Sequence, residues 1–198
     1  YDIQLIGRFN QENALAAGLA CLRLGASLTD IQAGISATRV PGRMEVLTQK
    51  NGAKIFVDYA HNAVSMEALL DALREYHPKR LVVVFGCGGN RAKDRRTSMG
   101  EIGGKKADLS IITADNSRYE KVEDIIADIR ESIVKTGGAF IEIPDRREAI
   151  FHAVQKAEPG DMIAIIGKGH EDYQEICGVR THFLDREVVE EALREMGE

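Results

Sequence analysis

Cysteines are few in this sequence, and their spacing excludes the common cysteine-based sites. The chain has three, Cys21, Cys87 and Cys177, and no two of them form a C-x-x-C pair. Disulfide scaffolds and structural zinc sites use paired cysteines. We therefore expect reduced, partly buried thiols and no metal site.

Long apolar runs are also missing. Residues 81–85 and 162–166 are among the longest and span about five residues, whereas a membrane-spanning helix needs about twenty. The opening segment YDIQLIGRFNQEN has neither a basic start nor an apolar signal core. We expect no membrane association, no export and a cytoplasmic location.

An excess of positive charge is the third feature that the sequence lacks. Its 26 Lys and Arg residues against 31 Asp and Glu residues give a net charge of -5, which argues against a dedicated binder of nucleic acids or anionic membranes. Apolar residues make up 44% and charged residues 29% of the 198 residues. This balance is typical of a soluble globular protein, with room for one domain and part of another.

The first fifth of the chain has a helical pattern. Residues 13–24 are rich in helix formers and are followed by Gly25, and Ser27 can cap a second short helix over LTDIQAGI. Pro41 and Gly42 then interrupt the pattern. The sequence predicts a helical hairpin in residues 1–39 and a separate domain in residues 40–198.

The second part alternates strand-like and helix-like segments. The runs KIFVDYA, LVVVF, LSIIT, AFIEI and MIAIIG are separated by amphipathic helices, a pattern typical of an α/β fold whose parallel sheet is covered on both faces. Three of these strands lead into the loops GCGGNRAKDRR, ADNSR and GKGHEDYQ. Ligands of open α/β sheets bind at such carboxyl ends, so we expect the site there.

These loops offer phosphate and zwitterion chemistry. The glycines of GCGGNR can let backbone amides approach an anion, with a tight turn as the alternative. Lys168 is followed by Gly169, so GKGHE is no Walker A loop. Arg118 and Glu171 suit the carboxylate and ammonium of an amino acid, or an ordinary salt bridge.

Six motifs in fixed order carry a family resemblance: GRFNQEN, VPGRME, DYAH, FGCGGNR, TADNSR and GKGHEDYQ. The chain resembles the ATP-dependent Mur ligases, and among them the UDP-N-acetylmuramoyl-tripeptide synthetases. The resemblance implies the tail of a central ATPase domain followed by a whole Rossmann-like carboxyl-terminal domain. It also implies ATP, Mg²⁺ and UDP-N-acetylmuramoyl-L-alanyl-D-glutamate (UDP-MurNAc-L-Ala-D-Glu) as reactants of the complete enzyme. No Walker A sequence is present, so we expect the segment by itself to be inactive and to bind ATP poorly.

The resemblance also assigns site residues. Nucleotide binding maps to Asn13 and Arg43, and less securely to Asp58 and His61 of DYAH. The amino-acid site of the diaminopimelate-adding members maps to Arg91, Asp115, Asn116, Ser117, Arg118, Gly167 and Glu171. The family implies no catalytic residue and no metal ligand on this segment.

We expect the acceptor to be meso-diaminopimelate and not lysine. Arg118, assisted by Arg91, would hold the distal carboxylate that lysine lacks, and Glu171 the distal ammonium. Ser117 stands where the family usually has proline, NAVSM replaces a TPD-like stretch, and GGNRA replaces GGDRD. These departures leave open a paralogue that adds lysine or another amino acid. A non-catalytic binding module or a relative such as a folylpolyglutamate or cyanophycin-type synthetase are further alternatives.

Overall fold

The computed structural model describes residues 7–197, which begin with a helical hairpin. Helix α1 (Arg8–Arg23) starts five residues before the predicted helix, and α2 (Leu28–Ala37) follows a short turn. Ser27 caps α2 as predicted, because its Oγ accepts a hydrogen bond from the Asp30 amide at 3.1 Å. The predicted segment 1–39 is therefore helical over the part that the structure describes, and residues 1–6 lie outside it.

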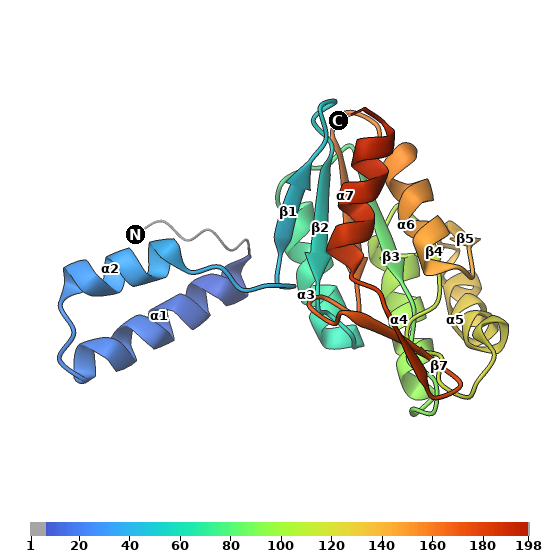
Figure 1. The fold of residues 1–198 in the computed structure, drawn as a ribbon, viewed down its shortest axis with the longest axis horizontal. Helices are drawn as coiled ribbons and strands as arrows, with labels where there is room; N and C mark the ends of the chain where they lie inside the picture. Colours follow the sequence, from blue (N-terminus) through green and yellow to red (C-terminus); the bar gives the residue numbers. More distant parts are fainter. Residues whose placement is uncertain (1–6, 198) are drawn as a thin grey trace.

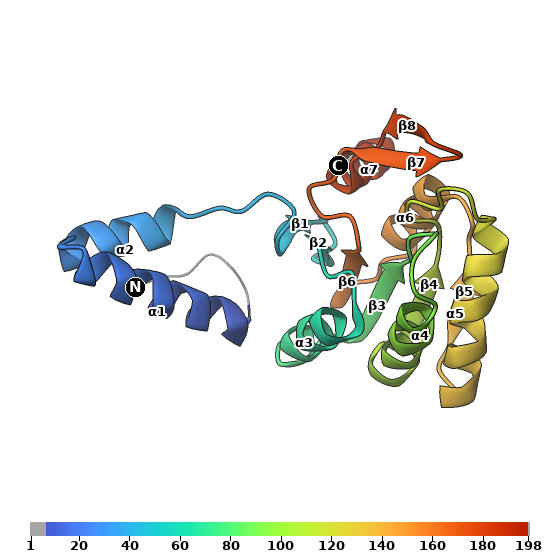
Figure 2. The same ribbon diagram turned by 90° about the horizontal axis from the view of Figure 1, so that it is seen from below.

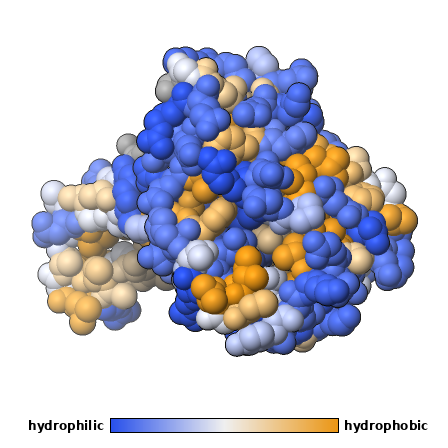
Figure 3. All heavy atoms as spheres, turned by 45° about the vertical axis from the view of Figure 1, so that its right-hand side comes forward, coloured by the Kyte–Doolittle hydropathy of each residue, from blue (hydrophilic) through white to orange (hydrophobic). Residues whose placement is uncertain are grey.

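The hairpin stands to one side of the rest of the fold (Figure 1). Neither of its two helices has a buried residue. Leu15 and Leu19 on α1 are 54% and 55% exposed, and Leu28 on α2 is 72% exposed. Figure 3 shows a mostly hydrophilic face of the molecule on which apolar side chains gather in separate patches. The hairpin thus exposes leucines that a helix of a folded core would bury.

Within residues 7–197, six strands form the main sheet, in the order β1-β2-β6-β3-β4-β5. They are β1 (Glu45–Thr48), β2 (Lys54–Asp58), β3 (Arg80–Phe85), β4 (Leu109–Ile112), β5 (Phe140–Glu142) and β6 (Asp161–Ile166). Strands β2 to β6 run parallel, which confirms the predicted α/β class with a mostly parallel sheet. Strand β1, which the sequence did not predict, pairs antiparallel with β2.

Helices cover both faces of the sheet (Figure 2). Helices α3 (Ala63–Arg74), α4 (Asp94–Lys106) and α5 (Val122–Thr136) pack on one face, and α6 (Arg146–Gln155) and α7 (Asp185–Glu195) on the other. Val83 and Phe85 of β3 enter the first core, and Val82 and Val84 enter the second. Each such fully buried side chain contributes about 1.5–3 kcal/mol, which explains why the strands are continuously apolar.

A second, two-stranded sheet lies beyond the end of β6. It consists of β7 (Tyr173–Ile176) and β8 (Val179–His182), joined by a turn in which Cys177 and Gly178 both have positive φ, 49° and 77°. The Arg118 amide donates to the Glu175 carbonyl at 3.0 Å. This hairpin is therefore attached to the loop that follows β4. None of the helices in residues 7–197 is long and apolar enough to cross a membrane.

Candidate functional site

The loops after β2, β3, β4 and β6 meet at the carboxyl edge of the sheet and line a cavity of about 260 Å³. We call it the acceptor cavity. Its lining comprises Tyr59, His61, Gly88, Arg91, Arg95, Asp115, Asn116, Arg118, Gly167 and Glu171. Three arginines and two carboxylates thus face one small space. Such a mixture of charges suits a ligand that carries both carboxylate and ammonium groups.

Asn116 connects the loops that form the acceptor cavity. Its side-chain amide donates to Glu171 Oε2 at 2.9 Å, while its Oδ1 accepts from the Glu175 amide at 2.9 Å. Its backbone carbonyl accepts from the Gly89 amide at 2.9 Å. Asn116 is only 4% exposed. Its polar groups are therefore used to hold the walls of the cavity together.

Gly88 and Gly89 allow two loops to approach closely. A Cβ at Gly89 would lie 1.9 Å from the Ser117 carbonyl oxygen, and one at Gly88 would lie 2.9 Å from Arg118 Nη1. Gly89 has no room for a side chain because the atoms that it meets are backbone, whereas at Gly88 the flexible end of Arg118 would have to move. Because the Gly89 amide already bonds Asn116, this glycine serves loop packing and not the anion binding considered from the sequence.

Arg118 has an unusual backbone conformation at the cavity wall. Its φ of 52° lies in the left-handed region, which costs a residue other than glycine roughly 1–2 kcal/mol. The guanidinium Nη1 donates to the Gly89 carbonyl at 2.9 Å. Arg91, which is exposed, and Arg95, which is partly buried, bring two further cations to the same space.

Glu171 is held by a phenol and a buried lysine as well as by Asn116. Tyr59 donates its hydroxyl to Glu171 Oε1 at 3.3 Å, and Lys168 Nζ lies 3.4 Å from Oε2. Burial, together with the negative charge of Glu171, raises the pKa of Tyr59. The Lys168 side chain is 0% exposed, and its Nζ also donates to the Tyr173 carbonyl at 2.5 Å. Lys168 thus compensates the charge of Glu171 from beneath the cavity.

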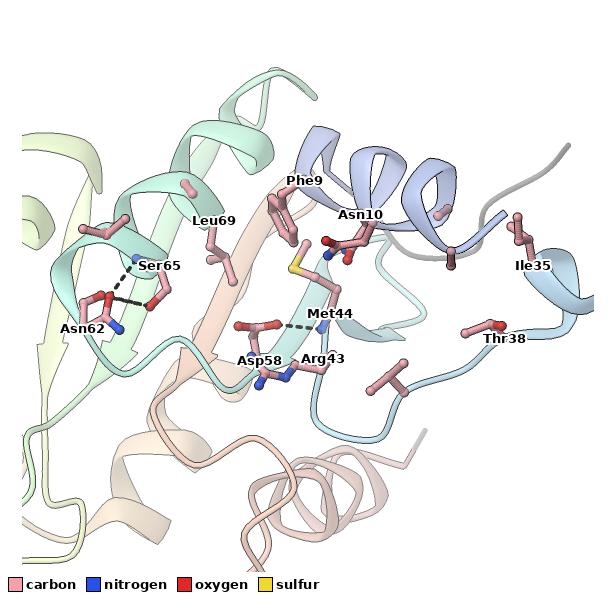
Figure 4. Close-up of a pocket in the computed structure, with 16 residues that line it drawn as sticks. Phe9, Asn10, Ile35, Thr38, Arg43, Met44, Asp58, Asn62, Ser65 and Leu69 are labelled. Carbon is pink, nitrogen blue, oxygen red and sulfur yellow. Dashed lines mark hydrogen bonds between the residues drawn. The ribbon is translucent and has the colours of Figure 1, made fainter. Parts of the chain in front are cut away.

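A larger cavity of about 1010 Å³ lies between the hairpin and the sheet domain (Figure 4). We call it the hinge cavity. Asn13 of α1, Arg43 of the linker and Asp58 at the end of β2 line it, along with apolar residues such as Phe9 and Leu69. An apolar space with a few polar groups suits a nucleoside.

Asp58 anchors the linker at the hinge cavity. Its Oδ2 accepts from the Met44 amide at 2.8 Å and its Oδ1 accepts from the Ala60 amide at 2.8 Å. Burial raises the pKa of Asp58, although these two hydrogen bonds and the nearby Arg43 act in the opposite direction. The adjacent Tyr59 lines the acceptor cavity, where its hydroxyl bonds Glu171, and its ring centre lies 4.8 Å from the guanidinium of Arg43, which lines the hinge cavity.

The structure divides the expected residues between the two cavities. Asn13, Arg43 and Asp58 line the hinge cavity, whereas His61 lies at the acceptor cavity. Of the expected acceptor residues, Arg91, Asp115, Asn116, Arg118, Gly167 and Glu171 are brought together. Ser117 is 1% exposed and lies outside the lining.

Sequence reasoning did not select Tyr59, Arg95 or Lys168 as site residues. Tyr59 stands in DYAH and Arg95 in the cation-rich segment after GCGGN, so both lay within motifs that had been singled out. Lys168 also lies within a motif, GKGHE, but the sequence excluded it only as a Walker A lysine and gave no sign of its burial, which depends on Glu171 and on the fold of β7. In the described part of the chain, no group of three or more His, Cys, Asp or Glu side chains could hold a metal ion.

Comparisons with known proteins agree with the resemblance. The family described as "Mur ligase, glutamate ligase domain" matches residues 42–169. A curated relative, the UDP-N-acetylmuramoyl-L-alanyl-D-glutamate--L-lysine ligase of Streptococcus sanguinis (strain SK36), is 50% identical over 185 residues, which are 92% of this chain and 38% of the relative. The chain therefore spans about two-fifths of the length of that relative.

Two solved structures are also similar. One, titled as a UDP-N-acetylmuramoyl-L-alanyl-D-glutamate--2,6-diaminopimelate ligase, matches with a TM-score of 0.77 and 37% identity over 100% of this chain and 40% of its own. The other is the Mycobacterium tuberculosis folylpolyglutamate synthase complexed with ADP and AMPPCP, with a TM-score of 0.65 and 22% identity over 83% and 38% of the two chains. At 22% identity, the similarity to the folylpolyglutamate synthase shows a shared fold alone.

Proposed function

Because this chain belongs to the Mur ligase family, we propose that it is the carboxyl-terminal part of an ATP-dependent ligase that joins L-lysine to UDP-MurNAc-L-Ala-D-Glu. The observation that carries the proposal is the acceptor cavity, where Arg118 and Glu171 face one small space from different loops. The curated relative at 50% identity is named a lysine ligase. That name favours lysine over the meso-diaminopimelate expected from the sequence.

The acceptor cavity has charges that fit lysine. Lysine carries one carboxylate and two ammonium groups. Arg118 can receive the carboxylate through the part of its guanidinium that Gly89 does not use, and Asp115 and Glu171 can receive the ammonium groups. In this proposal the positive charges of Arg91 and Arg95 offset the negative charges of Asp115 and Glu171.

A second candidate, meso-diaminopimelate, is favoured by the number of arginines. Arg91, Arg95 and Arg118 all line the cavity, and the additional carboxylate of diaminopimelate would use a second of them. A solved structure at 37% identity is named a diaminopimelate ligase. If Arg118 binds that distal carboxylate, Arg118→Ala will raise the KM for diaminopimelate and leave any use of lysine almost unchanged. If it binds the α-carboxylate, Arg118→Ala will impair both.

The hinge cavity is the proposed place where this segment contacts ATP. Asn13, Arg43 and Asp58 would contact the nucleotide together with a central ATPase domain that packs on the exposed leucines of the α1–α2 hairpin. Mg²⁺ and the phosphates would be held by that domain, since the present sequence has no Walker A loop. We place the ligase in the cytoplasm because ATP is its proposed substrate.

The proposed reaction has two bond-forming steps. An oxygen of the D-glutamate carboxylate attacks the γ-phosphorus of ATP, and ADP leaves. The amine nitrogen of the acceptor then attacks the acyl carbon, and phosphate leaves from the tetrahedral intermediate as the nitrogen loses its proton. This segment contributes binding and orientation of the amine, which converts a bimolecular attack into an effectively unimolecular one.

The test is a ligation assay with the full-length protein. ATP and UDP-MurNAc-L-Ala-D-Glu are supplied with either L-lysine or meso-diaminopimelate, and kcat/KM is measured for each. We expect a preference for lysine of at least about a hundredfold, equivalent to roughly 2.8 kcal/mol. A preference for diaminopimelate selects the second candidate, and ligation of neither amino acid contradicts the proposed function.

The isolated chain provides a separate test of the division between domains. Calorimetry with ATP should detect at most weak binding, because the phosphate-binding loop is absent from this sequence. A micromolar dissociation constant corresponds to about 8 kcal/mol. Affinity of that order in the isolated chain would contradict the assignment of most ATP contacts to the central domain.

A further inference from the structure

A buried arginine lies beneath the acceptor cavity without lining it. Arg146, the first residue of α6, has a side chain that is 0% exposed, as is that of Asp185, the first residue of α7. The two form a two-pronged ion pair, with Arg146 Nε 2.8 Å from Asp185 Oδ1 and Nη2 2.7 Å from Oδ2. Parallel hydrogen bonds of this kind fix the plane of the guanidinium.

The rest of this guanidinium contacts the backbone of two loops. Nη1 donates to the Ala114 carbonyl at 3.1 Å and Nη2 donates to the Ile166 carbonyl at 3.0 Å. Ala114 directly precedes Asp115, and Ile166 directly precedes Gly167. Arg146 therefore holds the backbone directly before each of two segments that line the cavity.

The sheet does not connect these two loops directly. They follow β4 and β6, and β3 lies between those strands in the sheet. Hydrogen bonds of the sheet thus pair each strand with β3 and leave the separation of the two loops to contacts beyond the strand ends. Arg146 spans that separation with one rigid, planar group.

The electrostatics agree with this geometry. Burial by itself disfavours a charged Arg146, but Asp185, followed by Asp115 and Glu171, more than offsets it and raises the pKa of the guanidinium. Two acids of the acceptor cavity therefore interact with this cation. A buried ion pair contributes little net stability compared with well-packed apolar residues. The more specific consequence of this pair is the geometry that it imposes on the two loops.

We propose that Arg146 is a positioning residue for the acceptor amino acid. Its guanidinium sets the distance between the loop that bears Asp115 and Arg118 and the loop that bears Glu171. The inference rests on the proposed function of the acceptor cavity. Asp185 acts through Arg146, because it holds the guanidinium in the orientation that reaches both carbonyls.

The test uses paired substitutions in the full-length ligase. Arg146→Met alone would leave Asp185 buried and unpaired and risks unfolding. The double variant Arg146→Met/Asp185→Leu removes both charges together and keeps the volume apolar, as in buried ion pairs that tolerate such replacement. The matched control is Arg80→Met/Asp161→Leu. That pair joins the first residues of β3 and β6 at 2.6 Å, at the opposite edge of the same sheet.

We expect the KM for the acceptor amino acid to rise at least about tenfold in the Arg146/Asp185 double variant, equivalent to about 1.4 kcal/mol. The KM for ATP should change less than about twofold, because Arg146 does not line the hinge cavity. The control should leave both constants within about twofold. An unchanged acceptor KM in the double variant, or an equal rise in both constants, overturns the proposal.

Arg146→Lys provides a second variant that keeps the charge opposite Asp185 but loses the fork that reaches both carbonyls. It should also raise the acceptor KM, and an acceptor KM equal to that of the unmodified enzyme would overturn the proposal even if the double variant does not fold.

Amide hydrogen exchange gives a readout that does not depend on activity. Exchange should accelerate at 115–118 and at 167–171 together in the double variant, and at neither in the control. If the unmodified enzyme ligates no amino acid, the proposed function fails. If it is active while exchange in the double variant is unchanged, the positioning role fails.

Discussion

Arg118 Nη1 donates a hydrogen bond to the Gly89 carbonyl oxygen at 2.9 Å, which joins the loop after β4 to the loop after β3. A Cβ at Gly88 would lie 2.9 Å from the same nitrogen, so the glycine leaves space for the guanidinium in this position. One end of the guanidinium is thereby fixed, and the cation already lies at the acceptor cavity before a ligand binds. Such preorganisation lowers the entropic cost of binding a carboxylate.

The first prediction concerns the guanidinium of Arg118. In the full-length ligase, Arg118→Gly should raise the acceptor KM at least about tenfold, since a charge-assisted hydrogen bond contributes about 1.5–3 kcal/mol. Glycine suits the φ of 52°, so this variant removes the cation without adding backbone strain. Steady-state kinetics measure the effect. Arg130→Gln on the exposed side of α5 is the control, and an acceptor KM that matches the control would contradict the role of Arg118.

The second prediction concerns the approach of the linker to the GKGHE loop. Gly42 has a φ of 66°, and a Cβ there would lie 2.0 Å from the His170 amide nitrogen. Gly52 has a φ of 90° with nothing within 4 Å. Gly52→Ala should cost about 1–2 kcal/mol of unfolding free energy from backbone strain, and Gly42→Ala about 1–3 kcal/mol more from overpacking. Urea denaturation measures both values, and equal losses would contradict the close contact.

The third prediction concerns thiol reactivity. Cys87 is buried, and burial raises its pKa to about 12, whereas Cys21 and Cys177 are exposed. At pH 8 roughly one Cys87 in ten thousand is therefore a thiolate, the reactive form. A chromogenic disulfide reagent should titrate two thiols in the native chain and three after denaturation. Three fast-reacting thiols in the native chain would show that Cys87 is accessible.

The fourth prediction concerns pH. Glu187 accepts a hydrogen bond from His182 at 2.6 Å, and this bond together with its negative charge raises the pKa of His182 above 6.5. The stabilisation from the pair is complete below the unfolded value and is lost as the pH rises through the folded pKa. NMR titration should give a higher His182 pKa in the native chain than in Glu187→Gln. An identical value in both would show that the pair is not formed in solution.

The sequence by itself determined the α/β class and the edge at which the cavity forms. Strands β3 and β6 are continuously apolar because both of their faces are buried, and that pattern is visible without a structure. Parallel strands place their carboxyl ends at one edge, so the loops with Asp115 and Glu171 were expected together. The Ser27 cap of α2 was likewise predictable, because capping is a local interaction.

Elements with weak apolar patterns required the tertiary structure. Strand β8 is exposed along its whole length, and β1 alternates between partly buried and exposed residues, so neither has the apolar run of a core strand. Helix α7 buries Val188, Val189 and Ala192 within an otherwise charged segment. Such elements are stabilised by their neighbours more than by their own composition.

The same reason explains the residues beneath the acceptor cavity. Arg146 lies in RREAIF and Lys168 in GKGHE, and the polar sequence around each suggests a side chain exposed to solvent. Only folding brings Asp185, which is 39 residues away, to Arg146, and Asn116, which is 52 residues away, to Lys168. A buried charge is stable only with such partners. The sequence therefore specified which loops form the cavity, and the tertiary structure decided which buried cations hold them at their observed positions.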